Sequence, residues 1–352
     1  MKSKSGRFET ILRTTRDAAE WQAALSASRS VFGSVEFARI YERQSGFESR
    51  LLMLQSDAGQ IAYPLFLRPL GDLAKAAHVQ ATCDTMTADY TGPFLVRGEV
   101  DAGTRQHIHE AFQEMGAVAE FIHLRVDGHE PAFFSPGDLE HNRDVVHVDL
   151  TVEKDVLWRD HFQHACRKNI NRSVRENVRI FEAASADHIR EFHRIYTQTM
   201  DRNGALARYY FPYEFFLAFF ESMPKHARFV LAEHGGRIAA ATLYLHDDAN
   251  IYSYLGGANL EFQQVRPTNA IIYDTILWGQ KLGKKHLVLG GGYSKDDNIF
   301  RFKQTFSPLT LPFSVVKRIH MPEAYGALCD AWRLSHPGVE PQSGYFPAYR
   351  SQ

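Results

Sequence analysis

The order of apolar and polar residues predicts short strands and amphipathic helices in the first half of the chain. Alternation or a short apolar run is typical of a strand, and apolar residues three and four positions apart are typical of a helix. The strands are expected at residues 6–13, 49–54, 60–67, 119–124 and 144–150, and the helices at residues 17–28, 34–41 and 105–115. Ser34 is expected to cap the second helix, because its hydroxyl can accept a hydrogen bond from a first-turn amide.

Two features interrupt these elements. The turn-forming residues 56–59 predict an antiparallel hairpin between the second and third strands, and Pro64 predicts an edge or a bulge within it. Residues 84–95 carry Gly92 and Pro93 and are interpreted as a polar loop that enters a strand.

The second half opens with a predicted helix, residues 155–176, in which apolar residues recur every four positions and basic residues line another face. The apolar residues are Trp158, Phe162, Cys166, Ile170 and Val174, and the basic ones are Lys168, Arg172, Arg175 and Arg179. The basic face is either a solvated surface or a contact for a phosphate backbone. Further helices are expected at residues 187–200, 213–223 and 269–282, and strands at 178–182, 227–233, 237–246, 250–255 and 286–289.

The two halves repeat nearly the same order of elements. This repetition favours two related α/β units with mixed sheets over one large sheet, and a length of 352 residues agrees with two domains of about 150 residues. We expect the domains at residues 1–150 and 151–314. Residues 314–319 resemble a strand and residues 321–332 have helical spacing, so we expect residues 315–352 to return to the first domain.

The composition, 44% hydrophobic and 23% charged, is typical of a soluble globular protein. No apolar run approaches the roughly 18 residues of a membrane span, and the polar start is unlike a signal peptide, so a cytoplasmic location is expected. The three cysteines lack CxxC spacing and the histidines form no HExxH motif, so neither disulfides nor a metal site is expected.

Charge is distributed unevenly although the net charge is only −1. Residues 151–320 carry 23 Lys and Arg against 17 Asp and Glu, whereas the remainder carries 17 against 24. An anionic partner of the second half, such as a phosphate-bearing cofactor or an RNA end, would explain this asymmetry, and so would a solvated surface.

The candidate chemistry gathers in residues 287–306, where an apolar strand, three glycines, a polar loop and a lysine between aromatic residues follow one another. Gly290–Gly292 allow a sharp turn or close approach of a small partner, and Asp296 and Asp297 can cap the next helix. Lys303 is expected against apolar surface, where an ammonium donates to an oxyanion more effectively than in water. The alternative is a glycine-rich turn followed by an ordinary amphipathic helix, since the run does not match GxGxxG.

Several segments resemble the FemABX family of peptidyltransferases, which consist of two tandem GNAT-like acyltransferase domains. In the second half the similar segments are RKNINRSVRENVRI (167–180), RYYFP (208–212), YSYLGGA (252–258), RPTNAIIYDTILWGQKLG (266–283) and LGGGYSKDDNIFRFKQTF (289–306). In the first half they are FGSVEFARIYE, YPLFLR and DYTGPFL. The resemblance covers nearly the whole chain.

The resemblance implies that an activated acyl group, in characterised members the aminoacyl ester of a tRNA, is transferred to an amine of a peptide-like or sugar-linked acceptor. The family's aromatic–lysine pair falls on Phe302 and Lys303. It implies that the lysine stabilises charge on the attacked ester carbonyl and that the aromatic ring positions the tRNA end. No cofactor is expected beyond this co-substrate.

The remaining candidates are binding residues. Arginine and tyrosine together can recognise carboxylates or phosphates of a long substrate, and residues 201–212 mix the two without a strong period, as a recognition loop would. For the acceptor we expect Tyr254, Arg208, Tyr209, Tyr210 and, as a further candidate, Arg202. For the donor we expect Arg301, Asn269 and Arg266.

Two alternatives keep the fold. In one, acyl-CoA is the donor and a small amine the acceptor. In the other, the protein is a non-catalytic binding protein for a peptide or RNA. GNAT enzymes hold the coenzyme A pyrophosphate on a glycine-bearing turn at a helix N-terminus, where this chain has Pro267, which lacks a backbone donor. The first domain is expected to lack a reaction centre, because it has no lysine–aromatic pair after a glycine run.

Overall fold

The computed structural model describes residues 8–26, 30–57, 59–126, 130–292 and 297–351. The chain divides into two compact units: unit 1 comprises residues 1–142 and 313–352, and unit 2 comprises residues 143–312. From the sequence, these divisions are expected at residues 150 and 314. None of the described helices combines the length and apolar character that a membrane span requires.

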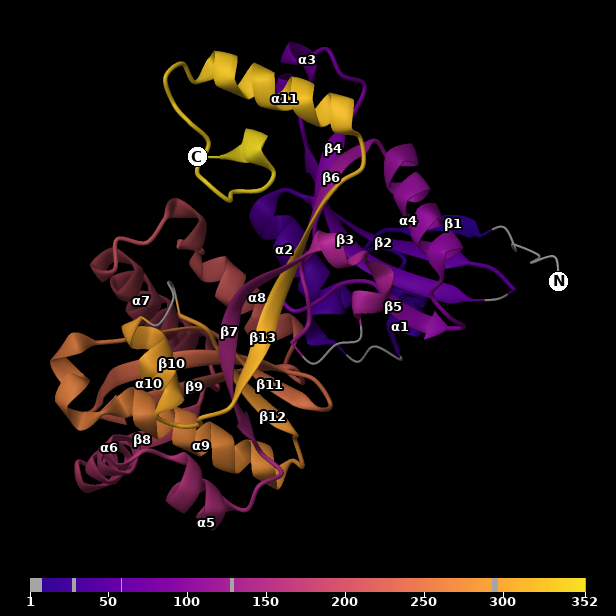
Figure 1. Ribbon diagram of the computed structural model, residues 1–352. Coiled ribbons are helices and arrows are strands. Elements are labelled where there is room, and N and C mark those ends of the chain that lie inside the picture. The colour runs from indigo at the N-terminus through magenta and orange to yellow at the C-terminus, as the bar shows by residue number, and fades with distance from the viewer. Residues whose placement is uncertain (1–7, 27–29, 58, 127–129, 293–296, 352) are drawn as a thin grey trace. The chain divides into compact units, whose positions relative to one another are not determined.

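Unit 1 is a mixed sheet with helices on both faces (Figure 1). Its strands are β1 (Glu9–Arg13), β2 (Glu48–Gln55), β3 (Gln60–Pro69), β4 (Cys83–Met86), β5 (Phe94–Arg97), β6 (Ala117–His123) and β13 (Thr310–Ile319). Its helices are α1 (Ala18–Leu25), α2 (Val35–Ser45), α3 (Asp72–Ala76), α4 (Ala102–Glu114) and α11 (Pro322–Ser335). The strand order is β1-β2-β3-β4-β6-β13, and β5 pairs with β3.

The local patterns of unit 1 explain most of these elements. The Ser34 hydroxyl accepts from the Phe37 amide at 3.3 Å and so caps α2, as predicted. The predicted hairpin forms, with Gln55 opposite Gln60. Pro64 lies opposite Leu51 on one side of β3, while on the other side the pairing passes from β5 to β4. Proline is tolerated there because neither β5 nor β4 pairs with β3 at residue 64, so no hydrogen bond on that side needs a proline N–H.

The prediction of a loop at residues 84–95 is wrong for its first residues, because residues 83–86 form β4. Asp84 is fully buried and is bonded by the guanidinium groups of Arg68 and Arg350 and, at 3.2 Å, by the Tyr349 hydroxyl. Arg350 and Tyr349 come from the C-terminal segment, which no local pattern connects with residue 84. A carboxylate buried in this way must be paired, and its partners hold it within the sheet.

The C-terminal segment belongs to unit 1. β13 pairs antiparallel with β6 over Val315–Ile319, and α11 then buries Leu328 and Trp332 in a cluster with Leu70 and Val118. From the sequence, this return is expected to begin near residue 315.

Unit 2 contains the remaining strands of the mixed sheet, between two layers of helices (Figure 1). Its strands are β7 (Leu139–Asp149), β8 (Arg179–Glu182), β9 (Ala227–His234), β10 (Arg237–His246), β11 (Asn250–Ala258) and β12 (His286–Gly290). Its helices are α5 (Lys154–Val156), α6 (His164–Arg175), α7 (Ala186–Arg202), α8 (Tyr213–Ser222), α9 (Pro267–Lys281) and α10 (Asn298–Gln304). The strand order is β7-β12-β11-β10-β9-β8; α7 and α8 pack on one face, and α9, with α6 beside it, on the other.

The prediction of a single helix at residues 155–176 is wrong. It is broken into α5, a π-helical turn (Leu157–His161) and α6, because Phe162 and Gln163 are extended. The Phe162 ring is buried 5.8 Å from that of Phe306, and the Gln163 amide donates to Thr305 at 2.9 Å. These long-range contacts outweigh the helical spacing. Val174, expected on the apolar face, is 68% exposed.

Candidate functional site

The parallel strands β11 and β12 part at the centre of unit 2. They pair from Asn250 opposite His286 to Tyr252 opposite Val288, and no further. Beyond that point β11 continues beside β10, and β12 beside β7. The crossover helix α9 connects the two strands, as a parallel pair requires. Ligands in open α/β sheets bind where the carboxyl ends of neighbouring strands diverge, so this opening is the candidate site.

Tyr254 lies at a β-bulge on the β11 side of the opening. The register of β10 and β11 shifts so that Leu243 faces Leu255 and Tyr244 faces Ser253, which leaves Tyr254 as the extra residue. Bulges re-aim side chains and are common next to active sites. The half-buried Tyr254 ring lies 6.0 Å from that of Phe219, edge to face.

Lys303 lies on the β12 side, in α10. The Asp297 carboxylate caps this short helix by accepting from the Phe300 amide at 2.8 Å, as predicted. Asp296, the other expected cap, lies outside the described residues. The half-buried Lys303 ammonium donates to the Gly291 carbonyl at 2.6 Å. Burial lowers the pKa of Lys303 to about 8; Asp297 opposes this shift and Arg143 adds to it.

The three glycines before α10 permit contacts within the chain. Gly290 has a positive φ of 82°, which favours glycine. A Cβ on Gly291 would lie 2.8 Å from the Arg143 stem, and one on Gly292 would overlap the Asp297 carboxylate. Their close neighbours are therefore Arg143 and Asp297, whereas the sequence suggested a small partner. Arg143, which no local sequence pattern singles out, donates to the Gly292 carbonyl at 2.6 Å.

Phe302 is half-buried and packs at the edge of the unit 2 core, 5.7 Å from the Phe306 ring and perpendicular to it. Lys303 and Phe302 are consecutive and therefore point in different directions from α10. The ammonium is fixed by Gly291, and the ring is fixed by the core.

The candidates for donor binding lie on two helices. Arg266 is the N-cap of α9 with a positive φ of 58°, and Pro267 follows at the first helical position. Asn269 is only 4% exposed, and its amide faces the buried Cys166 thiol, so its side chain belongs to the core. Arg301 is exposed on α10.

Comparisons with known proteins agree with this architecture. A family model described as Acetyltransferase (GNAT) domain matches residues 163–304. The crystal structure of FemX covers 90% of this chain and 99% of its own at 11% identity, with a TM-score of 0.68. The chain has a FemX-like tandem GNAT fold. No protein of curated function matches the chain in sequence.

Two further solved structures resemble the chain over most of its length. One is the C-terminal domain of a protein from Agrobacterium fabrum assigned as a lysylphosphatidylglycerol synthetase; it has 12% identity and a TM-score of 0.55 and covers 91% of this chain and 96% of its own. The other is a tandem GNAT protein from the clavulanic acid biosynthesis pathway, with 10% identity and a TM-score of 0.52, covering 89% and 99%. The fold class expected from the sequence is confirmed.

The loop after α7 in the GNAT domain presents several of the expected acceptor residues. Arg208 lies over the Tyr209 ring at 5.3 Å, and the two tyrosines Tyr209 and Tyr210 are 37% and 40% exposed. The buried Tyr196 hydroxyl anchors the loop by donating to the Tyr209 carbonyl at 2.6 Å. Arg202 donates to the Ala258 carbonyl at the end of β11.

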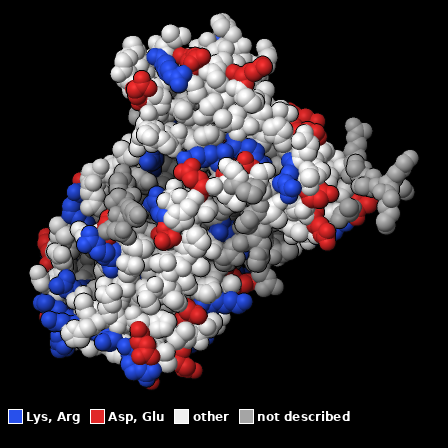
Figure 2. Space-filling model, viewed as in Figure 1, with Lys and Arg blue, Asp and Glu red and all other residues white. Residues whose placement is uncertain are grey.

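Basic side chains gather over the end of the GNAT domain where α6 lies (Figure 2). Lys168 and Arg175 are exposed and, among the described residues, make no hydrogen bond or ion pair. Arg172 lies between them along the helix and is 3.7 Å from Glu176. Positions 168, 172 and 175 share one helix face, so two unpaired cations and a weakly paired one point the same way.

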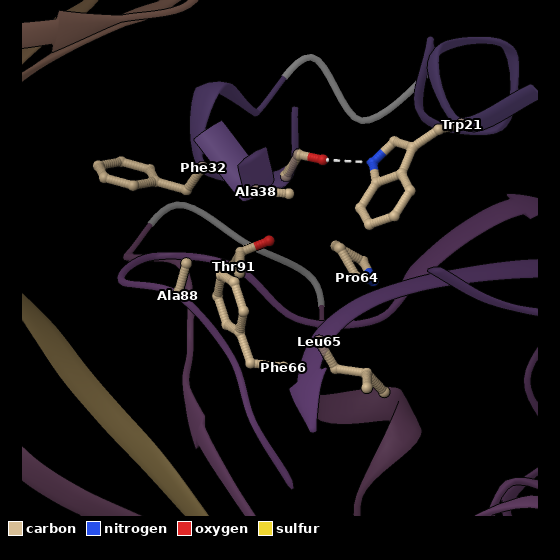
Figure 3. Close-up of a pocket in the computed structure, with 9 residues that line it drawn as sticks. Trp21, Phe32, Ala38, Pro64, Leu65, Phe66, Ala88 and Thr91 are labelled. Carbon is tan, nitrogen blue, oxygen red and sulfur yellow. Dashed lines mark hydrogen bonds between the residues drawn. The ribbon is translucent and has the colours of Figure 1, made fainter. Parts of the chain in front are cut away.

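Unit 1 contains a narrow apolar pocket (Figure 3). It encloses about 210 Å³, counting the solvent at its mouth, and is lined by Trp21, Phe32, Gly33, Ala38, Pro64, Leu65, Phe66, Ala88 and Thr91. The Trp21 indole donates to the Gly33 carbonyl at 2.9 Å. None of these lining residues titrates near neutral pH. The absence of a reaction centre from unit 1 stays a prediction.

Proposed function

We propose that the protein is an acyltransferase that moves an aminoacyl group from an aminoacyl-tRNA to an amine of a peptide-like or sugar-linked acceptor. The observation that carries this proposal is the Lys303 ammonium, which is half-buried at the end of a parallel strand and uses one of its three protons on Gly291. Among the described residues no other acceptor binds this ammonium, so two protons remain for a substrate oxygen.

In the proposed reaction, a neutral acceptor amine attacks the ester carbonyl carbon. The new C–N bond places negative charge on the carbonyl oxygen, and Lys303 stabilises this charge by donating to it. Collapse of the intermediate breaks the bond to the ribose oxygen. The proton of the attacking amine leaves through substrate or water to that oxygen, so that an amide and a free ribose hydroxyl result.

The basic face of α6 supports an RNA-bound donor. Lys168 and Arg175 are seven residues apart, which corresponds to about 10 Å along a helix, and single cations at such spacing can each neutralise a phosphate. Removing both should lower the slope of log affinity against log salt by about two.

Filter binding of charged tRNA over a range of salt concentrations tests this contact. The Lys168→Ala/Arg175→Ala variant is compared with Arg190→Ala/Arg194→Ala, a matched pair on α7 whose members are ion-paired with Asp187 and Glu191. Equal slopes in the two variants would contradict an α6 contact with RNA.

The acceptor is proposed to meet the loop that carries Arg208, Tyr209 and Tyr210. An exposed guanidinium beside two half-exposed phenols matches a substrate with carboxylate or phosphate groups. Tyr254, at the bulge, is proposed to contact the acceptor near the reacting amine, since the strands part beside it.

An acyl-CoA donor is the second candidate. The tandem GNAT protein from the clavulanic acid biosynthesis pathway is known in a form without AcCoA. In this chain the first amides of α9 lack intrahelical partners, as at any helix N-terminus. Arg266, at the cap of α9, would meet a pyrophosphate there. Pro267 removes one amide from this cradle, which favours the tRNA ester as donor.

Product analysis by mass spectrometry tests the proposal. The protein is incubated with a panel of amines and either charged tRNA or acetyl-CoA. An amide formed only from charged tRNA is the expected result, whereas an amide formed only from acetyl-CoA would select the second candidate. No product from either donor, together with a thermal shift on ligand addition, would favour a non-catalytic binding protein.

A further inference from the structure

Two cations bind successive carbonyl groups of the glycine turn that follows β12. Lys303 donates to the Gly291 oxygen and Arg143 donates to the Gly292 oxygen, both at 2.6 Å. Arg143 lies 149 residues before Gly292, on β7, the strand that pairs with β12. The turn is therefore held from two directions, by a helix and by a neighbouring strand.

The packing of the turn requires Arg143 to approach the backbone closely. A Cβ at residue 291 would lie 2.8 Å from the Arg143 Cδ and 2.9 Å from the Asp144 carbonyl oxygen, so glycine leaves room for the arginine stem. On the other side, Gly292 touches the Asp297 carboxylate, which also caps α10. The Arg143 stem thus fixes the backbone whose carbonyl orients Lys303.

We infer that Arg143 is a positioning residue for Lys303: it holds the Gly291–Gly292 turn in place and sets the position and charge of the lysine ammonium through that turn. The inference rests on the proposed catalytic role of Lys303. The charged groups that act on Lys303 are Asp297, from the cap of α10, and Arg143, from β7. Burial does most to disfavour the ammonium, Asp297 favours it, and Arg143 disfavours it further.

Titration of Lys303 in the whole protein tests this inference without any substrate. Trace acetylation with acetic anhydride follows the neutral fraction of each lysine, and mass spectrometry of the Lys303 peptide over a pH series gives its midpoint. The expected wild-type midpoint is about 8. Arg143→Met keeps much of the stem but removes the charge and the donor, so the midpoint should rise, and Arg143→Lys should restore most of the shift.

Arg194→Met, which removes an exposed arginine on α7, serves as the control and should leave the midpoint unchanged. Where acyl transfer is measurable, Arg143→Met should lower kcat by roughly 10- to 100-fold, because loss of positioning costs this much. KM for the acceptor should change far less.

The outcomes separate this inference from the proposed function. An unchanged Lys303 midpoint in Arg143→Met, or equal shifts in the Arg143 and Arg194 variants, would overturn the inference even if Lys303→Ala is inactive. A raised midpoint in Arg143→Met supports the Arg143–Lys303 coupling even if no donor is accepted, and in that case only the proposed reaction fails.

Discussion

The surroundings of Lys303 differ from those of an ordinary surface lysine. Its ammonium is half-buried and held by Gly291 at 2.6 Å. Lys303→Ala should lower turnover by roughly 10²- to 10³-fold, as loss of one oxyanion donor does, with little change in acceptor affinity. The melting temperature should stay nearly constant, because a partly exposed lysine contributes little stability.

Steady-state rates of Lys303→Ala, Lys303→Arg and Arg301→Ala check this expectation. The arginine variant keeps the charge but has a wider planar group, so it should restore only part of the rate. Arg301→Ala removes a neighbouring exposed charge that is a candidate for donor binding, so it should change KM for the donor while kcat stays within a few-fold of wild type. Turnover of Lys303→Ala near the wild-type value would end the catalytic assignment.

The pH dependence of turnover follows from the same residue. The pKa of Lys303 is lowered to about 8, so the ammonium predominates below pH 8 and is lost as the pH rises through that value. If the ammonium stabilises the oxyanion, kcat should fall above pH 8. If Lys303 instead accepted a proton from the acceptor amine, kcat would rise there.

Lys303→Arg is the matched control for this profile. A guanidinium stays charged throughout the range, so the variant should lose the alkaline fall while keeping its reduced rate. Profiles of kcat from pH 6 to 10 for both proteins make the comparison, and an identical fall in the arginine variant would assign it to another group.

At the scale of elements, the close packing of α7 on β11 depends on Gly257, the second glycine in YSYLGGA. A Cβ on Gly257 would lie 2.8 Å from the Ile195 carbonyl oxygen and would also overlap the Thr199 hydroxyl. The same hydroxyl accepts from the Ala258 amide at 3.2 Å. The helix therefore lies against backbone here, and β11 cannot carry a side chain at this point.

Gly257→Ala should consequently destabilise the protein by about 1–3 kcal/mol, because the added methyl has nowhere to go. Gly326→Ala is the opposite case: Gly326 lies within α11 with no atom within 4 Å of the added Cβ, and alanine should stabilise by about 0.5–1 kcal/mol. Urea unfolding of both variants measures the two differences. A neutral Gly257→Ala would show that α7 can move away from β11.

The whole molecule is two units of which only one is continuous in sequence. Unit 2 occupies residues 143–312 and contains its own core, from Val146 to Phe306. Unit 1 needs residues from both ends of the chain, because Val316 completes the core beside α4, and Leu328, Trp332 and Tyr349 cover another part of its sheet. Unit 2 should therefore fold when it is expressed alone, whereas unit 1 should fold only when both of its segments are present.

A fragment of residues 143–312 should fold alone, with a cooperative thermal transition. A fragment of residues 1–142 should not, since it leaves the edge of β6 unpaired and Val118 and Ala119 uncovered. Joining residues 1–142 to 313–352 through a short flexible linker should restore folding. Circular dichroism and gel filtration show whether each of the three fragments is folded and compact. A folded 1–142 fragment would contradict the need for the returning segment.

The sequence by itself determined the features that depend on neighbours along the chain. The turn at residues 56–59, the Ser34 cap and the helical spacing after Pro322 each act within a few residues, so the hairpin, α2 and α11 could be predicted. The same holds for Lys303, since a glycine run, a capping aspartate and aromatic neighbours lie within 20 residues of one another. Hydrophobic periodicity and helix capping depend on residues within a few positions of one another, so the sequence alone predicts them.

Only the tertiary structure decided the features that depend on distant partners. The helix expected at residues 155–176 breaks at Phe162, because the Phe162 ring packs against Phe306 and the next amide donates to the Thr305 carbonyl. Asp84 lies in a strand because Arg350, 266 residues away, pairs with it. Arg143 reaches the glycine turn because β7 lies beside β12. Burial and ion pairing depend on contacts between residues that are far apart in the sequence, and a local pattern of residues cannot predict those contacts.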